Sequence, residues 1–298
     1  MGELAGGLLV MSWNVRSLLK RLPEVQLLAD THHPDIVLIQ ETHANRDSPQ
    51  FTLQRYTGVR ADRPAGRGGG VAIYVKSDIP FSTIDLGFLT RAEAVGVQLN
   101  INNKPLSFVS LYVPPEKGRL SEFRSLAKKL APLFFIAGDL NAHNPCFGSS
   151  KLNKTGGYLE KVLSEANLRL HIPPSKTRID SRSPNKDAIL DYGLSHESLE
   201  DVKIQVLNEG SSDHKPILFQ LPNQILVDKP RHVKIVTNWK GIQDNFQKVN
   251  SIPSTKRNVV FRARSKTQVV SCAWANTRVV TLSQSNSTVV LLASRRET

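Results

Sequence analysis

Five apolar segments of the chain end in polar residues whose side chains could do chemistry: Asn14, Glu41, Asp139 with Asn141, Asp191, and Asp213 with His214. Segments such as Ile36–Ile39 and Leu133–Ile136 are apolar at every position, so each fits a strand that is buried on both faces. A polar residue at the end of such a strand is costly to bury unless it has partners there. We therefore predict that these ends meet at one edge of a sheet. Together they would supply oxygen ligands for a hard cation, a base for water, and a histidine held by a carboxylate.

No single residue of this set identifies a site. A Glu after a strand is more often a cap or a surface charge, and Gly138–Asn141 also fits a plain turn. His214 could be an incidental loop histidine. Because Ser212, Asp213 and His214 are consecutive, they cannot form a nucleophile triad on sequence alone. The order and spacing of the whole set are what favour a single site.

Short apolar runs separated by turn residues predict the elements that position these side chains. The predicted strands are Leu8–Asn14, Ile36–Gln40, Val71–Val75, Val95–Ile101, Leu106–Val113, Leu133–Ala137, Ile189–Leu194, Val202–Leu207 and Pro216–Leu221. Helices are predicted at Pro23–Thr31, with Pro at its start, at Ser121–Leu130, behind a Ser cap, and at Tyr158–Leu168. Many strands with few helices predict an α+β fold in which two packed sheets carry the helices on their outer faces.

The composition is that of an ordinary globular protein. Hydrophobic residues make up 40% and charged residues 22% of the 298 residues, which argues against a disordered, collagen-like or coiled-coil chain. No apolar run approaches the roughly 18 residues of a membrane span, and the N-terminus is a poor signal peptide. Cys146 and Cys272 have neither disulfide nor zinc spacing, which favours free thiols in a reducing, intracellular compartment.

The positive charge of the chain is concentrated near its C-terminus. The whole chain has a net charge of +13, but residues 223–298 hold 13 basic and 3 acidic residues, which leaves +3 for residues 1–222. We predict one domain over 1–222 and a basic linker or tail over 223–298, which is either disordered or contains a short helix at Asn238–Val249. The tail has no polymerase signature. Its charge favours a polyanionic partner, and a merely solvated tail is an equal alternative.

The ordered motifs resemble those of the endonuclease/exonuclease/phosphatase superfamily over residues 8–222. The matching positions are Asn14, Gln40-Glu41-Thr42, Tyr112, Gly138–His143, Thr177, Asp191 and Ser212–Pro216. The form Asn141-Ala142-His143, with the glycine-rich stretch Gly66–Val71, is similar to the endonuclease domain of jockey-like non-LTR retrotransposons. That stretch lacks the Gly-Lys-Ser/Thr ending of a nucleotide-binding loop, so we interpret it as a tight turn into the strand Val71–Val75.

This resemblance implies a DNase I-like, four-layered α/β sandwich of two mostly antiparallel sheets flanked by helices. It also implies phosphodiester hydrolysis with Mg²⁺, and Mn²⁺ is a second candidate. In the retrotransposon branch the enzyme would be an endonuclease that nicks DNA and leaves a 3′-hydroxyl for target-primed reverse transcription. The implied partners are DNA and, through the basic tail, the element's RNA. No membrane partner is expected, and a DNA substrate implies the nucleus.

The resemblance further implies a role for each matching residue. Glu41 would hold the metal, with Asn14 beside it and Asp213 on the same side. Asp139 would orient or deprotonate the attacking water, and Asn141 would fix Asp139. The remaining residues would contact or support the phosphate. Tyr112 would donate a hydrogen bond to it, and His214, oriented by Asp191, would bind it. Thr177 and Ser212 would supply supporting hydrogen bonds, and His143 would contact phosphate or DNA.

Arg16 departs from the family pattern, because some members place a second acid at this position. The departure puts a two-metal mechanism in question, and we interpret Arg16 as a solvated loop charge rather than a phosphate contact. Three alternatives stay open: an abasic-site nuclease, a lipid phosphodiesterase and an inactive nucleic-acid-binding remnant. The Asn-Ala-His form and the lack of a membrane-binding segment argue against the lipid enzyme, and the complete residue set argues against decay.

Overall fold

The computed structural model describes residues 7–64, 68–87, 89–101, 104–130, 133–184 and 187–222, together with the backbone of 268–274, 277–284 and 287–293. Contacts divide the chain into two units, Met1–Arg231 and His232–Thr298, which are described separately. In the described part of the chain, no helix has the length and apolar character needed to cross a bilayer.

The first unit contains two six-stranded sheets. One sheet has the order β11-β12-β1-β2-β4-β3, and its members are β1 (Leu9–Asn14), β2 (Ile36–Gln40), β3 (Tyr56–Ala61), β4 (Val71–Lys76), β11 (Lys203–Val206) and β12 (Ile217–Gln220). The other has the order β5-β6-β7-β8-β10-β9, and its members are β5 (Phe81–Ile84), β6 (Glu93–Ile101), β7 (Lys104–Tyr112), β8 (Phe134–Asp139), β9 (Leu168–His171) and β10 (Asp191–His196). The pairs β1/β2 and β7/β8 are parallel, and the other neighbours are antiparallel.

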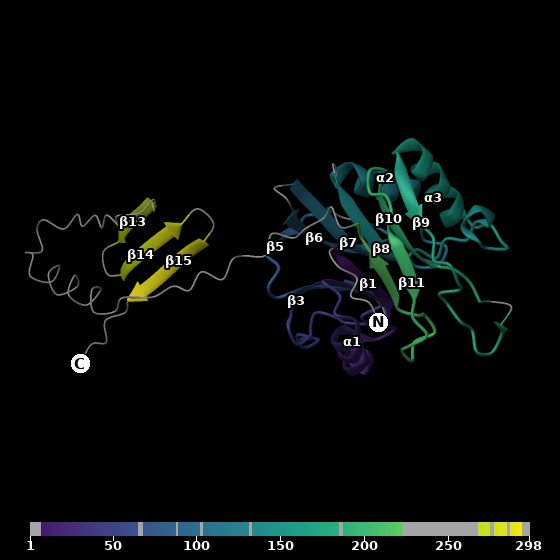
Figure 1. Cartoon of the computed structure of the whole chain (residues 1–298), viewed down its shortest axis with the longest axis horizontal. Helices are drawn as coiled ribbons and strands as arrows, with labels where there is room; N and C mark the ends of the chain where they lie inside the picture. Colours follow the sequence, from purple (N-terminus) through teal and green to yellow (C-terminus); the bar gives the residue numbers. More distant parts are fainter. Residues whose placement is uncertain are drawn as a thin grey trace, which may run out of the picture. The chain divides into compact units, whose positions relative to one another are not determined.

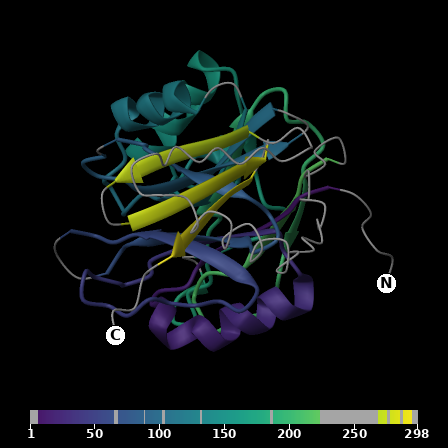
Figure 2. The same cartoon turned by 90° about the vertical axis from the view of Figure 1, so that its left-hand side faces the viewer.

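Helices cover the outer faces of both sheets. The helix α1 (Leu18–His32) connects β1 to β2, α2 (Leu120–Lys129) connects β7 to β8, and α3 (Lys154–Glu165) follows the short 3₁₀ turn η1 (Pro145–Phe147). Figure 1 and Figure 2 show α1 on one outer side of the unit and α2 and α3 on the opposite side. The result is a four-layered α+β sandwich, as the sequence predicts.

Three apolar cores hold these layers together. The central core lies between the sheets, where Ile36 and Leu38 of β2 pack in one cluster with Phe108 of β7 and Phe135 of β8. A second core lies under α1, and a third under α2 and α3. Strand β2 is apolar at every position but its last because its two faces contribute to the central core and to the core under α1.

All nine predicted strands are confirmed to within two residues at each end, and the predicted helices need correction. The helix predicted to start at Pro23 starts at Leu18, so Pro23 lies inside α1, where burial of Leu18, Val25 and Leu28 outweighs the hydrogen bond lost at proline. The predicted Ser cap of α2 is wrong, because Ser121 already lies within the helix and Arg119 is the capping residue.

The third predicted helix lies a few residues too late in the sequence. Helix α3 starts at Lys154 because the side chain of Asn153 accepts a hydrogen bond from the backbone N–H of Gly156 at 2.8 Å. It ends at Glu165, and Leu168, predicted to be helical, instead begins strand β9.

The second unit contains a three-stranded antiparallel sheet, β13 (Gln268–Trp274), β14 (Thr277–Gln284) and β15 (Ser287–Ala293). The predicted helix Asn238–Val249 lies outside the described residues. The boundary at residue 222 and the role of 223–298 as a basic linker or tail stay predictions.

Candidate active site

The ends of β1, β2 and β8 bring three polar side chains into direct contact. The amide nitrogen of Asn14 donates hydrogen bonds to Glu41 Oε1 and to Asp139 Oδ2, both at 2.9 Å. Asn14 and Asp139 are almost fully buried, and Asn14 belongs to one sheet while Asp139 belongs to the other. One amide group therefore fixes the spacing between two carboxylates that come from different sheets.

Glu41 is held in a left-handed backbone conformation at the end of β2, with a φ of 51°. His43 also has a positive φ, of 54°, and its Nε2 lies 3.0 Å from Glu41 Oε2. The backbone N–H groups of Thr42 and His43 donate to the carbonyl oxygens of Gly70 and Gly69. A Cβ on Gly70 would collide with the Thr42 hydroxyl, so Gly69 and Gly70 support the Glu41 turn in addition to leading into β4.

The carboxylate of Asp139 is shared between two donors. Its Oδ1 accepts a hydrogen bond from the backbone N–H of Asn141 at 3.0 Å, and its Oδ2 accepts the one from Asn14. Asn141 has a φ of 44°, and its side-chain nitrogen donates to the carbonyl oxygen of Val113. These contacts leave Asp139 a fixed orientation at the end of β8.

His214 lies between two carboxylates. Its Nδ1 is 2.8 and 3.1 Å from the oxygens of Asp191, and its Nε2 is 3.7 Å from Asp139 Oδ2. The hydroxyl of Thr177 donates to Asp191 Oδ2 at 2.6 Å. All four residues are buried. Contacts thus run continuously from Glu41 through Asn14, Asp139, His214 and Asp191 to Thr177.

Burial and neighbouring charges together set the pKa values of His214 and Asp139. Burial disfavours the charged imidazole, but the negative charges of Asp191 and Asp139 outweigh burial and raise the pKa of His214. Burial, together with the charge of Asp191, raises the pKa of Asp139, while His214 and Asn14 oppose that rise. Since both oxygens of Asp139 accept hydrogen bonds, we assign the proton to His214.

Two other groups keep their ordinary protonation state at neutral pH. Burial alone would raise the pKa of Glu41, but the hydrogen bonds from Asn14 and His43 outweigh it and lower that pKa. Burial and the nearby charges of Glu41 and Asp139 raise the pKa of Tyr112, which ends strand β7. The Tyr112 phenol is therefore a neutral hydrogen-bond donor.

Asp213 and Arg16 form an ion pair, which corrects the interpretation of Arg16 as a solvated loop charge. Nη1 of Arg16 lies 2.9 Å from Asp213 Oδ2, and Nε of Arg178 lies 3.3 Å from the same oxygen. Burial alone would raise the pKa of Asp213, but His214 and Arg16 outweigh it and lower that pKa. No role was predicted for Arg178 from the sequence. Its position directly after Thr177 is the signal that could have suggested one.

Ser212 and His143 have different partners, and the partner of Ser212 belongs to the series of contacts described for the site. The hydroxyl of Ser212 donates to the carbonyl oxygen of Asn14 at 2.8 Å, which ties the loop before β12 to the end of β1. His143 instead has its Nδ1 3.2 Å from the Ser149 hydroxyl. Burial and the neighbouring charge of Lys151 lower the pKa of His143, so the ring is neutral beside a cationic surface.

Gln40 is a buried polar residue whose contacts the sequence does not reveal. Its side-chain nitrogen donates to the Ser110 hydroxyl at 3.0 Å, and that hydroxyl donates to the carbonyl oxygen of Ile39 at 2.8 Å. Gln40 lies in β2 and Ser110 in β7, so this link also crosses between the sheets.

The donor set fits a hard divalent cation at Glu41. The Glu41 carboxylate has hydrogen-bond partners in Asn14, His43 and Tyr112, which leaves lone-pair capacity on its two oxygens, and the side chain is 17% exposed. The atoms of Asp139, Asp191 and His214 also lie within 4.8 Å of one another and could in geometry hold an ion. The protonated imidazole already supplies positive charge there, so a metal between the same carboxylates would be repelled.

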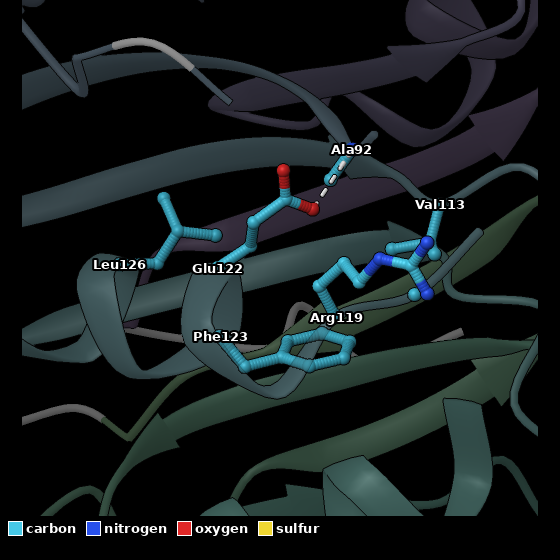
Figure 3. Close-up of a pocket in the computed structure, with 7 residues that line it drawn as sticks. Ala92, Val113, Arg119, Glu122, Phe123 and Leu126 are labelled. Carbon is cyan, nitrogen blue, oxygen red and sulfur yellow. Dashed lines mark hydrogen bonds between the residues drawn. The ribbon is translucent and has the colours of Figure 1, made fainter. Parts of the chain in front are cut away.

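The pocket in Figure 3 is a separate feature beside α2. It is lined by Ala92, Val113, Gly118, Arg119, Glu122, Phe123 and Leu126. Of these residues, Val113 also contacts the site, because its carbonyl oxygen accepts the hydrogen bond from Asn141. The Glu122 carboxylate accepts hydrogen bonds from the Thr90 hydroxyl and from the backbone N–H groups of Thr90, Arg91 and Ala92. We assign Glu122 a structural role in holding this turn.

Comparison with known proteins gives consistent matches. The pattern of the Endonuclease/Exonuclease/phosphatase family matches residues 11–214. The chain is 27% identical over 221 residues to the RNA-directed DNA polymerase from mobile element jockey of Drosophila funebris, covering 73% of this chain and 24% of that protein. The chain thus spans about a quarter of the length of this curated relative.

Solved structures share the fold. The endonuclease domain of TRAS1, a telomere-specific non-LTR retrotransposon, matches with a TM-score of 0.60 and 19% identity, over 73% of this chain and 99% of that domain. The AP endonuclease LMAP from Leishmania major matches with a TM-score of 0.60 and 16% identity, over 74% and 89%. At such identities the likeness establishes the architecture alone, and it bears out the predicted DNase I-like sandwich.

Proposed function

Because the chain belongs to the endonuclease/exonuclease/phosphatase family, we propose that it is a divalent-metal-dependent endonuclease that nicks DNA and leaves a 3′-hydroxyl. The family and its structural relatives support the coarser statement that the chain is a phosphoester hydrolase. The nicking activity is favoured by the likeness to the jockey polymerase and to the TRAS1 endonuclease domain. Such a nick would provide the primer for target-primed reverse transcription.

One observation supports the proposal most strongly: the unbroken series of contacts from Glu41 to Thr177 across the two sheets. It sets a carboxylate suited to a cation on one side and a charged imidazole on the other. Between them lies Asp139, whose orientation is fixed by two hydrogen bonds. A phosphodiester needs these groups because its hydrolysis depends on positioning and on stabilising the charge that develops on phosphorus oxygens.

Each residue then has a defined part in the hydrolysis. Asp139 accepts the proton of the attacking water, and its raised pKa makes it a stronger base than an exposed Asp. The water oxygen bonds to phosphorus while the bond from phosphorus to the 3′ oxygen breaks, and that oxygen leaves as the hydroxyl after gaining a proton from solvent. His214 and Tyr112 donate hydrogen bonds to the non-bridging oxygens, and Asp191 keeps the imidazole charged and oriented.

Glu41, with Asn14 beside it, would hold Mg²⁺ or Mn²⁺, because these ions prefer one or two carboxylates together with water and phosphate oxygens. When bound, the ion supplies a Lewis acid that stabilises negative charge on the phosphate and on the leaving oxygen. Asn14 itself acts by keeping Glu41 and Asp139 at a fixed separation. Ser212 supports Asn14 from its backbone side.

DNA is the proposed substrate, and RNA binding by residues 223–298 and a nuclear location are proposals that accompany it. His143 is proposed to line the DNA surface rather than to touch the scissile phosphate, because its neighbours include Lys151, Lys176 and Arg178. A neutral ring in that cationic setting could pack against a sugar or base while the lysines meet phosphates.

A supercoiled-plasmid assay with Mg²⁺ tests the proposal. We expect the wild-type chain to convert supercoiled plasmid to the nicked form, with ends that a DNA polymerase can extend. Asp139→Asn and His214→Ala should each lower the rate by about 10² to 10⁴-fold, the usual contribution of a general base or a charge-stabilising donor. Glu165→Gln is the matched control, because it removes the carboxylate at the end of α3 from an exposed ion pair with Arg124 of α2.

Substrate comparison separates the alternatives. Nicking of intact DNA at a rate above that on abasic DNA or on a phosphoinositide supports the retrotransposon-type endonuclease. A faster reaction on abasic DNA or on the lipid would reassign the substrate within the family. Equal nicking by wild type, Asp139→Asn and His214→Ala would show that the site described here does not carry the activity.

A further inference from the structure

Arg16 and Arg178 bind the same carboxylate oxygen at the edge of the site. The distances to Asp213 Oδ2 are 2.9 Å from Arg16 Nη1 and 3.3 Å from Arg178 Nε. The other oxygen, Oδ1, is buried and has no hydrogen-bond partner within the described residues. One negative charge therefore faces two guanidinium groups, which stay protonated at any pH of interest, and the cluster is net positive.

Arg16 is also fixed to the centre of the site through its backbone. It follows β1 with a φ of 43°, and its N–H donates to Asn14 Oδ1 at 3.1 Å. Its side chain is 53% exposed, so its remaining N–H groups are accessible to a substrate. Asp213 raises the pKa of Arg16 against the effect of burial, and Glu41 adds to this, which places the guanidinium within electrostatic reach of both carboxylates.

A divalent ion on Asp213 would bring a third positive group to a carboxylate that already has two. It would have to displace the guanidinium groups or bind beside them against their repulsion. The carboxylate of Glu41 is instead contacted by the Asn14 amide at Oε1 and by the His43 imidazole at Oε2, and not by a pair of guanidinium groups.

We propose that Arg16, held by Asp213, takes the place of a second metal ion, so that the active site binds one divalent ion, at Glu41. The inference rests on the proposed function, and it replaces the predicted metal role of Asp213. Arg16 is then a fixed positive charge that binds a phosphate oxygen of the substrate. A purely structural role, in which Arg16 only ties the end of β1 to the loop before β12, would leave the number of bound ions independent of residue 16.

The test counts Mn²⁺ ions bound to the full chain without DNA, from the electron paramagnetic resonance signal of the free ion. We expect one ion for wild type and loss of that ion in Glu41→Gln. Arg16→Asp exchanges the positive charge for an oxygen ligand and should bind two ions. Arg16→Lys keeps a positive charge and should still bind one. If Arg16→Asp does not fold, Arg16→Asn removes the charge, adds an amide oxygen, and should also bind a second ion.

Each other outcome has a definite meaning. Two ions on the wild-type chain, or one ion on a folded Arg16→Asp or Arg16→Asn chain, would overturn the inference. If the wild type binds two ions and nicks plasmid with Mg²⁺, the proposed function stands and only this inference fails. A wild-type chain that binds no ion and nicks no DNA would remove the proposed function and the inference together.

Discussion

Replacing Thr177 with Val tests whether the orientation of Asp191 depends on a single hydroxyl. Thr177 is fully buried, and its Oγ1 donates to Asp191 Oδ2 at 2.6 Å while accepting from the backbone N–H groups of Leu190 and Asp191 at 3.0 and 3.3 Å. Val keeps the shape of the side chain and removes all three contacts. A hydrogen bond to a charged group contributes about 1.5 to 3 kcal/mol, and leaving buried donors unpaired adds to the loss. We therefore expect the free energy of unfolding to fall by about 3 kcal/mol.

The matched control is Thr177→Ser, which keeps the hydroxyl and loses one methyl group, for a cost of about 1 kcal/mol. Urea unfolding of the full chain at neutral pH measures both values, and an unchanged slope shows that the folded state is the same. In the nicking assay Thr177→Val should lower kcat about tenfold with little change in KM, because His214 loses its fixed partner. A Val variant within about 1 kcal/mol of wild type, or a destabilised one with full kcat, would refute this reasoning.

Three further predictions concern stability and metal binding. Burial and the charge of Arg169 lower the pKa of His171 to about 4, so stability is present above the unfolded pKa of about 6.5 and is lost as pH falls toward 4. The loss at pH 5 relative to pH 7 is about 2 kcal/mol, which His171→Leu should abolish in urea unfolding. Gly70→Ala should lower the free energy of unfolding by about 1 to 2 kcal/mol, because a Cβ at a φ of 82° meets the Thr42 hydroxyl. The same change should weaken Mn²⁺ binding measured by calorimetry, and unchanged binding would contradict the prediction. Glu122→Gln should lower the free energy of unfolding by about 2 kcal/mol, because Glu122 accepts four hydrogen bonds. The nicking rate should not change, since these bonds lie away from the site, and a loss of nicking would show that Glu122 and the site are coupled.

The strands of the first unit that sequence reasoning missed are edge strands. Strands β3, β5 and β9 lie at sheet edges, and most of their side chains are only partly buried or exposed. An edge strand has one paired side, so it needs few apolar residues and loses the pattern that identifies a strand. Strands such as β2 and β8 were predictable for the opposite reason, because burial on both faces leaves an apolar run that no turn or exposed helix tolerates.

The sequence predicted which residues form the candidate site, but it predicted few of the contacts between them. The strand ends that carry Asn14, Glu41 and Asp139 follow from apolar runs, and the structure brings these side chains together. The pairing of Arg16 with Asp213 could not be predicted, because it joins residues 197 positions apart through side chains on two loops. Loop backbone in left-handed conformations, as at Arg16, has no apolar periodicity from which its direction could be read.

The topology explains why residues so distant in sequence share one site. Among the described strands of the first unit, each sheet has one parallel pair, β1/β2 and β7/β8, and each pair is joined by a helix on the outer face. The carboxyl ends of a parallel pair lie at the same edge of the sheet, which places Asn14 beside Glu41 and Tyr112 beside Asp139. The antiparallel neighbours β12 and β10 begin where β1 and β8 end, so the loop before β12 and the first residue of β10 bring His214 and Asp191 to that edge.

Hydrogen bonds between the two sheets then turn their edges into a single site. The bond from Asn14 to Asp139 joins the sheets within the site, and the bonds from Gln40 to Ser110 and from Ser110 to the carbonyl oxygen of Ile39 also join them. These bonds lie next to the central core, so the position of one sheet on the other fixes the distance from Glu41 to Asp139. Packing between the sheets is therefore part of the proposed catalytic geometry, because a shift of one sheet would separate Glu41, the proposed cation ligand, from Asp139, the proposed base, without altering either residue.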